Sequence, residues 1–376
     1  MTETRPEQQV MDRERFVPAE LGVYRLSPFG FVGTTLLIFL VAFGSFVAIA
    51  EITGRPSVFE TIPLTEDLSH TGGRPGFAWQ GQYYLMESEA WVGFVLSLIL
   101  TAALALSENG RWVWKSLEQD LVAALPAEGE ADARAFIQGA PRSWRHRYRT
   151  MFAIGIVGGL AFNILMMFAN GIPAHLYLNS IGLWFTLFTP FLFALGIRAG
   201  VDVSRESGEL RRLIHTYLDV DLFHLDRLTV FGNLGQRGAL SWALMAAIVL
   251  LFVADRTQIA VALPTLALSI FGGIFIFGSA VNPVHRRIRD AKQAELVRIH
   301  EEMAKCRERA LSGDADAASA LAGLTDYEQW IEQRPEWPLS PTVTQRFALY
   351  ILIPIIPIVA SYVFEKTADL VLTGAN

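Results

Sequence analysis

The sequence predicts an all-α protein: a polytopic bundle of about seven transmembrane helices, N-terminus inside and C-terminus outside, with a cytoplasmic helical hairpin. Three observations lead to this fold class. The 376-residue chain is 52% hydrophobic and 18% charged, whereas charged residues make up about 25% of an ordinary soluble domain. Seven apolar runs, each about 18 residues or longer, have the length that a membrane-spanning helix needs. Lys and Arg are concentrated in alternate connections between these runs.

The predicted spans are free of acidic and basic side chains. In chain order they are 29–50, 90–107, 150–170, 178–197, 238–254, 258–282 and 346–364, the last being free of charge from Phe347 onward. The second and fifth runs are short, so they depend on neighbouring helices or a thin bilayer. Trp and Tyr flank several runs, as Trp112 and Trp114 do after the second, and such aromatic belts mark membrane interfaces.

The orientation of the chain follows from its positive charges. Cytoplasmic loops carry an excess of Lys and Arg, and 27 of the 31 Lys and Arg residues fall on the side of the N-terminus. That side is therefore predicted to be cytoplasmic, and an odd number of spans places the C-terminus outside. The predicted parts are a cytoplasmic N-terminal segment 1–28, a six-span membrane domain 29–282 with an extracytoplasmic loop 51–89 and cytoplasmic helical inserts 108–149 and 199–237, a cytoplasmic helical hairpin 283–345, and a last span with a short external tail, 346–376.

The last predicted span contains two prolines, Pro354 and Pro357. Each proline removes a backbone donor and frees the carbonyl four residues earlier. Such carbonyls need partners in lipid, so this helix is expected to face protein or a wet cavity where it bends. Three interpretations stay open: a tolerated kink inside the bundle, a gate or pore-lining bend, and a re-entrant segment that does not cross.

The predicted hairpin follows the sixth span without a break. Leu296, Ile299 and Met303 begin an apolar seam with the alternating spacing of a coiled coil. Ser312-Gly313 ends the first arm, and Asp314 is placed to cap a second helix. The seam either packs the two arms together or binds another subunit or a cytoplasmic partner protein at 284–333.

Three segments near the C-terminus carry a resemblance to a group of known proteins. They are VHRRIRDAKQAEL (284–296), PEWPLS (335–340) and RFALYILIPIIP (346–357). Over this last quarter, the chain resembles uncharacterised multi-spanning bacterial inner-membrane proteins that have no assigned activity. The resemblance implies a multi-pass protein of the bacterial inner (plasma) membrane, and it implies no reaction or ligand.

Polar and small residues within the spans are the candidate functional residues of the membrane domain. Gly155, Gly159, Asn163 and Asn170 share one face of the third span. Such a stripe mediates close helix packing, or it presents amides to a pore. A second candidate is an acidic cluster in and beside the external loop, which either focuses cations at a pore mouth or is an ordinary solvated surface. Its members are Glu51, Glu60, Glu66, Asp67, Glu87 and Glu89.

Features of common membrane enzymes are missing from the sequence. No predicted span contains Lys, Asp or Glu, and no histidine lies mid-span, which disfavours retinal attachment, carboxylate proton relays and paired haem ligands. There is one cysteine, Cys306, and no phosphate-binding loop or nucleophile motif. We therefore expect no enzyme activity, no cofactor, no metal site and no nucleic-acid binding.

Two functional classes remain. A passive ion channel or pore, assembled as an oligomer, agrees with charge-free spans, small-residue stripes, a kinked last helix and an acidic outer loop. The alternative is a membrane scaffold or signalling component that binds partners through the cytoplasmic hairpin. An intramembrane enzyme fits the sequence least, because no nucleophile and base are paired.

Overall fold

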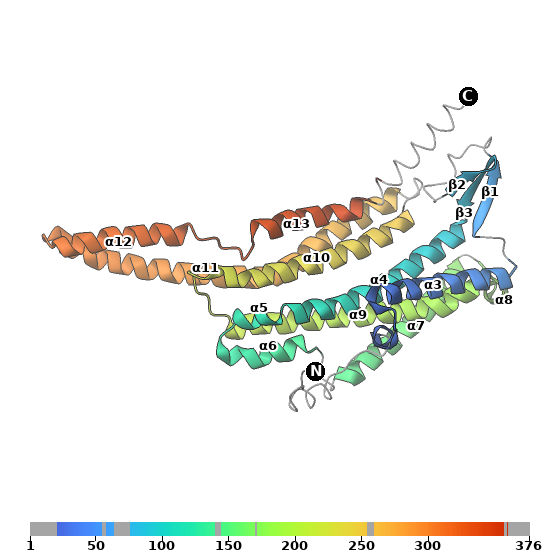
Figure 1. The fold of residues 1–376 in the computed structure, drawn as a ribbon, viewed down its shortest axis with the longest axis horizontal. Coiled ribbons are helices and arrows are strands. Elements are labelled where there is room, and N and C mark those ends of the chain that lie inside the picture. The colour runs from blue at the N-terminus through green and yellow to red at the C-terminus, as the bar shows by residue number, and fades with distance from the viewer. Residues whose placement is uncertain are drawn as a thin grey trace, which may run out of the picture.

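The computed structural model describes residues 21–54, 58–63, 76–139, 144–169, 171–253, 259–356 and 359. It is predominantly helical, and its long helices run roughly along one axis (Figure 1). The helices are α2 (Gly22–Leu26), α3 (Gly30–Ile52), α4 (Ser88–Ser116), α5 (Glu118–Ala123), α6 (Glu130–Ile137), α7 (Arg145–Ala169), α8 (Ala174–Leu178), α9 (Gly182–Tyr217), α10 (Thr229–Leu250), α11 (Ile259–Leu311), α12 (Ala315–Glu332) and α13 (Pro341–Leu352), with short 3₁₀ turns η3 (Ala127–Gly129), η5 (Leu225–Leu228), η6 (Leu251–Val253) and η8 (Ile353–Ile355).

Within the described part of the chain, five helices are long and apolar enough to cross a membrane, and they identify a membrane protein. They are Gly30–Ile52, Ser88–Ser116, Arg145–Ala169, Gly182–Tyr217 and Leu266–Leu311. The predicted spans 238–254 and 346–364 are not among them: α10 is 22 residues long but its first half is the more polar one and contains Arg237, and α13 ends at Leu352 with part of its run outside the described residues. The number seven and the orientation therefore stay predictions.

The helices that carry the apolar runs form two groups. The first contains α3, α4, α7 and α9, with α7 and α9 in the most extensive contact. The second contains α10, the first half of α11, and α13, where Phe277 and Phe347 stack with ring centroids 4.0 Å apart. Helix α4 contacts α10, and Trp91 Nε1 donates to the Leu251 carbonyl at 3.2 Å, so the two groups are joined near one end.

A small antiparallel sheet lies in the predicted external loop, which corrects the all-α prediction. Strands β1 (Phe59–Pro63), β2 (Gly76–Trp79) and β3 (Gln82–Met86) pair in the order β1-β3-β2. The β2–β3 turn is formed by Gln80 and Gly81, both with positive φ, which matches the twist of a two-residue hairpin. Tyr83 and Leu85 are buried while Gln82 is exposed, so strand alternation was present in the sequence.

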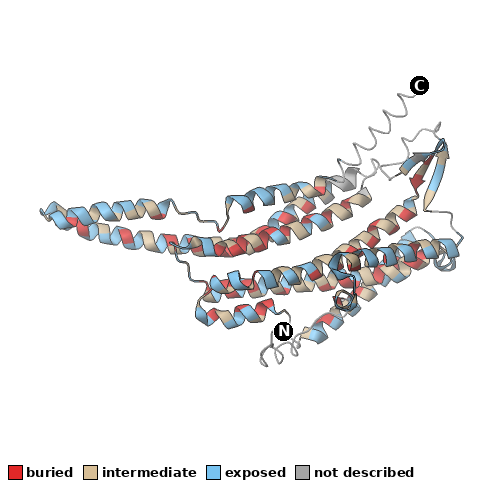
Figure 2. Ribbon diagram, in the orientation of Figure 1, coloured by how far each residue is buried: buried red, intermediate tan, exposed pale blue. Residues whose placement is uncertain are grey.

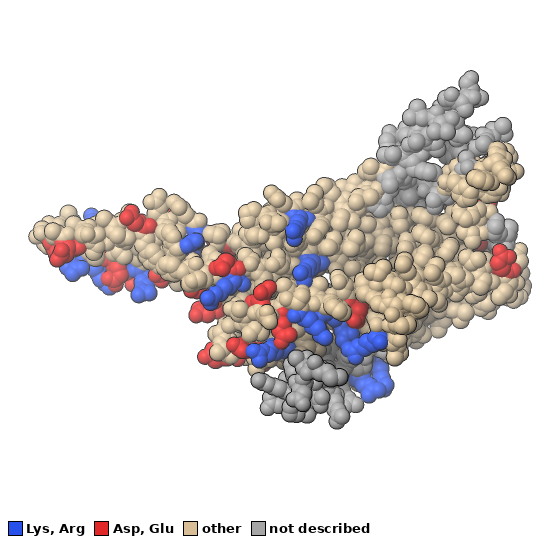
Figure 3. Space-filling view, in the orientation of Figure 1, with Lys and Arg blue, Asp and Glu red and all other residues tan. Residues whose placement is uncertain are grey.

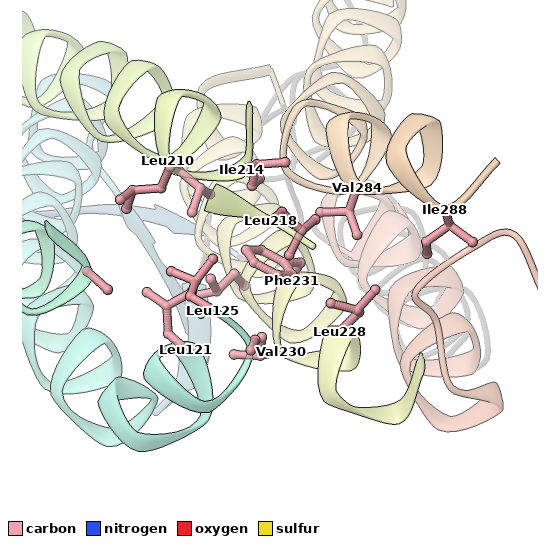
Figure 4. Close-up of a cluster of buried hydrophobic side chains, with 14 of the residues drawn as sticks. Leu121, Leu125, Leu210, Ile214, Leu218, Leu228, Val230, Phe231, Val284 and Ile288 are labelled. Atoms are coloured by element: carbon pink, nitrogen blue, oxygen red, sulfur yellow. The ribbon is translucent and has the colours of Figure 1, made fainter. Parts of the chain in front are cut away.

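The largest buried apolar cluster among the described residues lies beyond the apolar runs, where the inserts 108–149 and 199–237 meet the hairpin (Figure 4). Leu121, Ile214, Phe231 and Ile288 are each at most 1% exposed. They come from α5, α9, α10 and α11, so segments far apart in sequence share one core. Figure 2 shows that buried residues gather where α10 and α11 meet, whereas the far part of the hairpin is largely exposed.

Charged side chains divide the surface into two parts. In Figure 3, they gather over the hairpin, α5 and α6, and the neighbouring ends of the membrane helices, while the opposite part of the molecule is almost free of charge. Large apolar side chains are exposed on this charge-free part, including Val41 at 63%, Val157 at 66% and Phe168 at 73%. Lipid is the solvent that such a surface suits. The basic residues nearest the charged ends of the apolar runs are Arg111, Arg149, Arg198, Arg237 and Arg286. We call this set the basic boundary.

Candidate functional site at the junction of α4, α7 and α9

The glycines of the predicted stripe lie in the contact between α7 and α9. A Cβ built on Gly155 would be 2.3 Å from Ala194 Cα, and one on Gly159 would be 2.4 Å from Pro190 Cα. Both distances are far below van der Waals contact, so the two backbones touch only because these positions have no side chain. The stripe is thus occupied by a neighbouring helix, as the packing interpretation expects.

Asn163 takes part in the same packing. Its side chain is buried, with 6% exposure for the residue, and Nδ2 donates to the Gly159 carbonyl at 2.9 Å. Oδ1 accepts from the Tyr177 hydroxyl at 3.2 Å, so the amide links α7 to α8. Asn170, the other amide of the stripe, lies outside the described residues. The geometry gives Asn163 a bonding role between α7 and α8.

The proline-containing end of α13 borders a small cavity. Pro354 is buried, and Pro357 lies outside the described residues. The cavity has room for about one water molecule. It lies between α10, α11 and α13, and its lining includes Ala239, Ser269 and Tyr350. A cavity of this size is too small to be a conduction path by itself.

The predicted acidic cluster is dispersed where the structure describes it. Glu51 is exposed at the end of α3, Glu60 is exposed on β1, and Glu87 and Glu89 are half-buried at the start of α4. Glu66 and Asp67 lie outside the described residues. Within the described chain, no three His, Cys, Asp or Glu side chains converge as metal ligands do.

The predicted partner seam is covered by the hairpin's own second arm. Helices α11 and α12 lie against each other, and Ile299 is 3% exposed. Leu296 and Met303 are partly buried against the same apolar cluster. Ile299 is therefore not available to a partner, and the packing of Leu296 and Met303 against the same cluster supports the interpretation in which the two arms pack together.

Polar contacts fix the hairpin where it returns to the membrane domain. Lys292 is 8% exposed, and its Nζ donates to the carbonyls of Glu332 at 2.7 Å and Arg334 at 3.3 Å. A cation at the last carbonyls of a helix is favourable, and here it ends α12. His285 stacks on Trp337 at 4.0 Å, with Nδ1 2.9 Å from the Glu336 carbonyl.

A buried ion network joins α4, α7 and α9 at the basic boundary, and the sequence analysis did not anticipate it. Arg198 is 3% exposed. Its Nη1 donates to Asp202 Oδ2 at 3.0 Å, and its Nη2 donates to Ser107 Oγ on α4 at 3.2 Å. The Tyr148 hydroxyl of α7 donates to Asp202 Oδ1. One carboxylate and one guanidinium therefore hold three helices together.

The network continues along α9 through a second buried arginine. Arg205 is 8% exposed and pairs with Glu209 at 2.9 Å and with Glu206 at 3.7 Å. Both Arg198–Asp202 and Arg205–Glu209 have the i, i+4 spacing of helix ion pairs, so the sequence did carry a signal. Removing one partner of such a pair leaves an uncompensated charge, which is costly. The residues bond to one another, and their geometry suits a structural junction.

Comparison with known proteins adds no relative: no family, curated protein or solved structure matches the chain. The resemblance of the last quarter to bacterial inner-membrane proteins therefore stays an expectation based on its own residues.

Proposed function

We propose that the protein is a membrane scaffold or signalling component of the bacterial inner membrane, which presents a folded helical core and a long hairpin to soluble partners. The observation that supports this proposal most directly is the position of the largest buried cluster. Twenty buried residues form it beyond the apolar runs, whereas the next largest clusters, which lie among the membrane helices, have five each. A pore-forming chain needs no such core outside lipid.

The contacts within the membrane domain support the same choice. Gly155, Gly159 and Asn163, three of the four residues proposed to line a pore, are engaged by α8 and α9. The ion network between Tyr148, Arg198 and Asp202 closes the same helices at the basic boundary. Helix packing therefore accounts for the polar groups that suggested a channel.

The docking surface of this scaffold is the outer face of the hairpin. The seam around Ile299 is filled by α12, while Val297 is 57% exposed and Leu311 at the tip is 78% exposed. Charged residues of both signs surround them, including Arg298, Glu301 and Lys305. A mixed surface of this kind suits a soluble protein partner with its own charged rim.

A channel stays the competing function, and one specific feature favours it: beside a cavity, α13 gives way to the 3₁₀ turn η8, which contains Pro354. Because that cavity holds about one water, it is too small to conduct, and we place the conducting path of the channel alternative between subunits. The channel proposal therefore requires an oligomer, whereas the scaffold proposal does not.

Reconstitution separates the two functions. The purified chain is placed in lipid vesicles loaded with an ion-sensitive dye, and its mass in detergent is measured by light scattering. The scaffold proposal predicts no ion flux above that of empty vesicles. Flux that rises with protein content, together with a ring-like oligomer, would overturn it.

A further inference from the structure

We propose that the start of α7 forms a binding site for an anionic phospholipid, with the phosphate head group at Arg145, His146 and Arg149 and the acyl chains on the apolar face of the same helix. This site is separate from the scaffold function and does not depend on it.

The segment 144–149 presents its basic side chains outward while one residue anchors it. Tyr148 is 3% exposed, and its hydroxyl bonds Asp202 of α9. Arg145, His146, Arg147 and Arg149 are all exposed. At about 100° per residue, Arg145, His146 and Arg149 fall within about 100° of one another on the helix surface. The anchored tyrosine therefore holds a compact basic surface in a fixed orientation.

These cations are not neutralised by the described part of the chain. Among the described residues, no acidic side chain forms an ion pair with Arg145, Arg147 or Arg149. Instead, the Arg147 guanidinium lies over the Trp144 ring, 4.7 Å from its centroid. Tryptophan is enriched at the level of lipid head groups, so this contact places the basic surface at the depth where phosphates lie.

The apolar half of the site lies directly along the same helix face. Val157 and Leu160 are 66% and 41% exposed, and both project within about 40° of the direction of His146. Val157 is roughly 16 Å further along the helix axis, about half the thickness of a hydrocarbon core. A lipid with its phosphate at His146 would therefore lay its acyl chains over these two side chains within one leaflet.

The occupant is identified by complementary charge and by this continuity. Clustered Lys and Arg next to a span attract anionic lipids with about 1 kcal/mol per residue, while a neutral zwitterionic lipid gains little. Soluble phosphate would match the cations and leave the apolar face uncovered. The combination of both surfaces selects a phospholipid with a net negative head group.

The test is a lipid titration of the full-length chain in detergent, read by native mass spectrometry. Dioleoyl phosphatidylglycerol and dioleoyl phosphatidylcholine are compared, and sn-glycerol 3-phosphate serves as a competitor without acyl chains. For the first phosphatidylglycerol bound, the triple variant R145Q/R147Q/R149Q, which removes both arginines of the site and the neighbouring Arg147, is expected to lose about tenfold to 100-fold in affinity. Its affinity for phosphatidylcholine should not change, and glycerol phosphate should not displace the lipid.

The control removes the same number of charges from the hairpin, far from the apolar runs, as R298Q/K305Q/R307Q. It should bind phosphatidylglycerol like the wild type. Thermal unfolding in phosphatidylcholine shows whether each variant is folded. If the triple variant is unfolded, the single variants Arg145→Gln and Arg149→Gln are used, each with an expected loss of about fivefold. Equal losses in test and control variants, no loss in either, or displacement by glycerol phosphate would each overturn the proposal.

Discussion

Gly159 lies directly against Pro190: a Cβ on the glycine would be 2.4 Å from the Pro190 Cα. The neighbouring Gly158 has only a Phe193 ring atom in reach, at 3.9 Å. The two adjacent glycines of α7 therefore differ in the space that a methyl group would find, although they differ little in backbone conformation.

This difference predicts opposite effects of one substitution at two positions. Gly159→Ala should lower the stability of the membrane domain by about 1–3 kcal/mol, because α7 and α9 must move apart. Gly158→Ala should raise it by about 0.5–1 kcal/mol, because alanine loses less entropy in a helix. Unfolding in detergent, followed by circular dichroism, measures both. Equal effects at the two positions would show that α7 and α9 do not make this contact.

The amide of Asn163 is predicted to contribute to stability without affecting ion flux. Asn163→Leu removes the acceptor of the Tyr177 hydroxyl, and an interhelical side-chain hydrogen bond contributes about 1 kcal/mol in membranes. Tyr177→Phe removes the same bond from the other side. The double variant should therefore cost less than the sum of the two single variants. Additive losses in the same unfolding assay would contradict the bond, and a loss of dye-detected flux would revive the pore interpretation.

A charge in the hairpin seam is predicted to open the hairpin. Ile299→Glu places a carboxylate at a position with 3% exposure, and burying an unpaired charge is among the few changes that destabilise by more than about 3 kcal/mol. Val297→Glu adds the same charge two residues away at a position with 57% exposure and should be tolerated. Limited proteolysis within 284–333 measures the result. Resistance of the Ile299→Glu protein would mean that α12 does not cover the seam.

Lys292 is predicted to hold the returning segment 333–340 in place. Lys292→Met keeps most of the apolar stem and removes the donor to the Glu332 and Arg334 carbonyls. Hydrogen bonds from a charged donor contribute about 1.5–3 kcal/mol each, so amide hydrogen exchange should accelerate at the end of α12. Lys305→Met is the matched control, because Lys305 pairs with Glu302 on an exposed surface and should change exchange little. Similar amide exchange in both variants would show that Lys292 does not cap the end of α12.

Sequence reasoning identified features that depend on local pattern. Long charge-free runs, the Gly155/Gly159 spacing and the end of the first hairpin arm at Gly313 each follow from neighbours in the chain. The helix that covers the seam could not be predicted in this way, since an apolar repeat gives no information on which helix will cover it. The Arg198–Ser107 contact joins residues 91 positions apart, so it too depends on tertiary structure.

The sheet was missed for a different reason. Its strands are four or five residues long, and the Gln80–Gly81 turn lacks the Asn or Asp that usually marks such a hairpin. The boundaries of α9 also differ from the prediction. The helix continues for 36 residues, from the predicted span into the predicted insert. Helical periodicity does not change at the edge of a membrane, so charge alone marked that boundary.

Helix α11 is one continuous helix of 53 residues with Pro283 within it, so it is about 80 Å long. Its tip at Leu311 lies about 40 Å beyond Pro283. A rigid rod works as a lever: a tilt of about 10° at this proline would carry the tip through roughly 7 Å, which exceeds the rise of one helical turn. Small rearrangements among the lipid-embedded helices would thereby become displacements large enough for a soluble protein to detect.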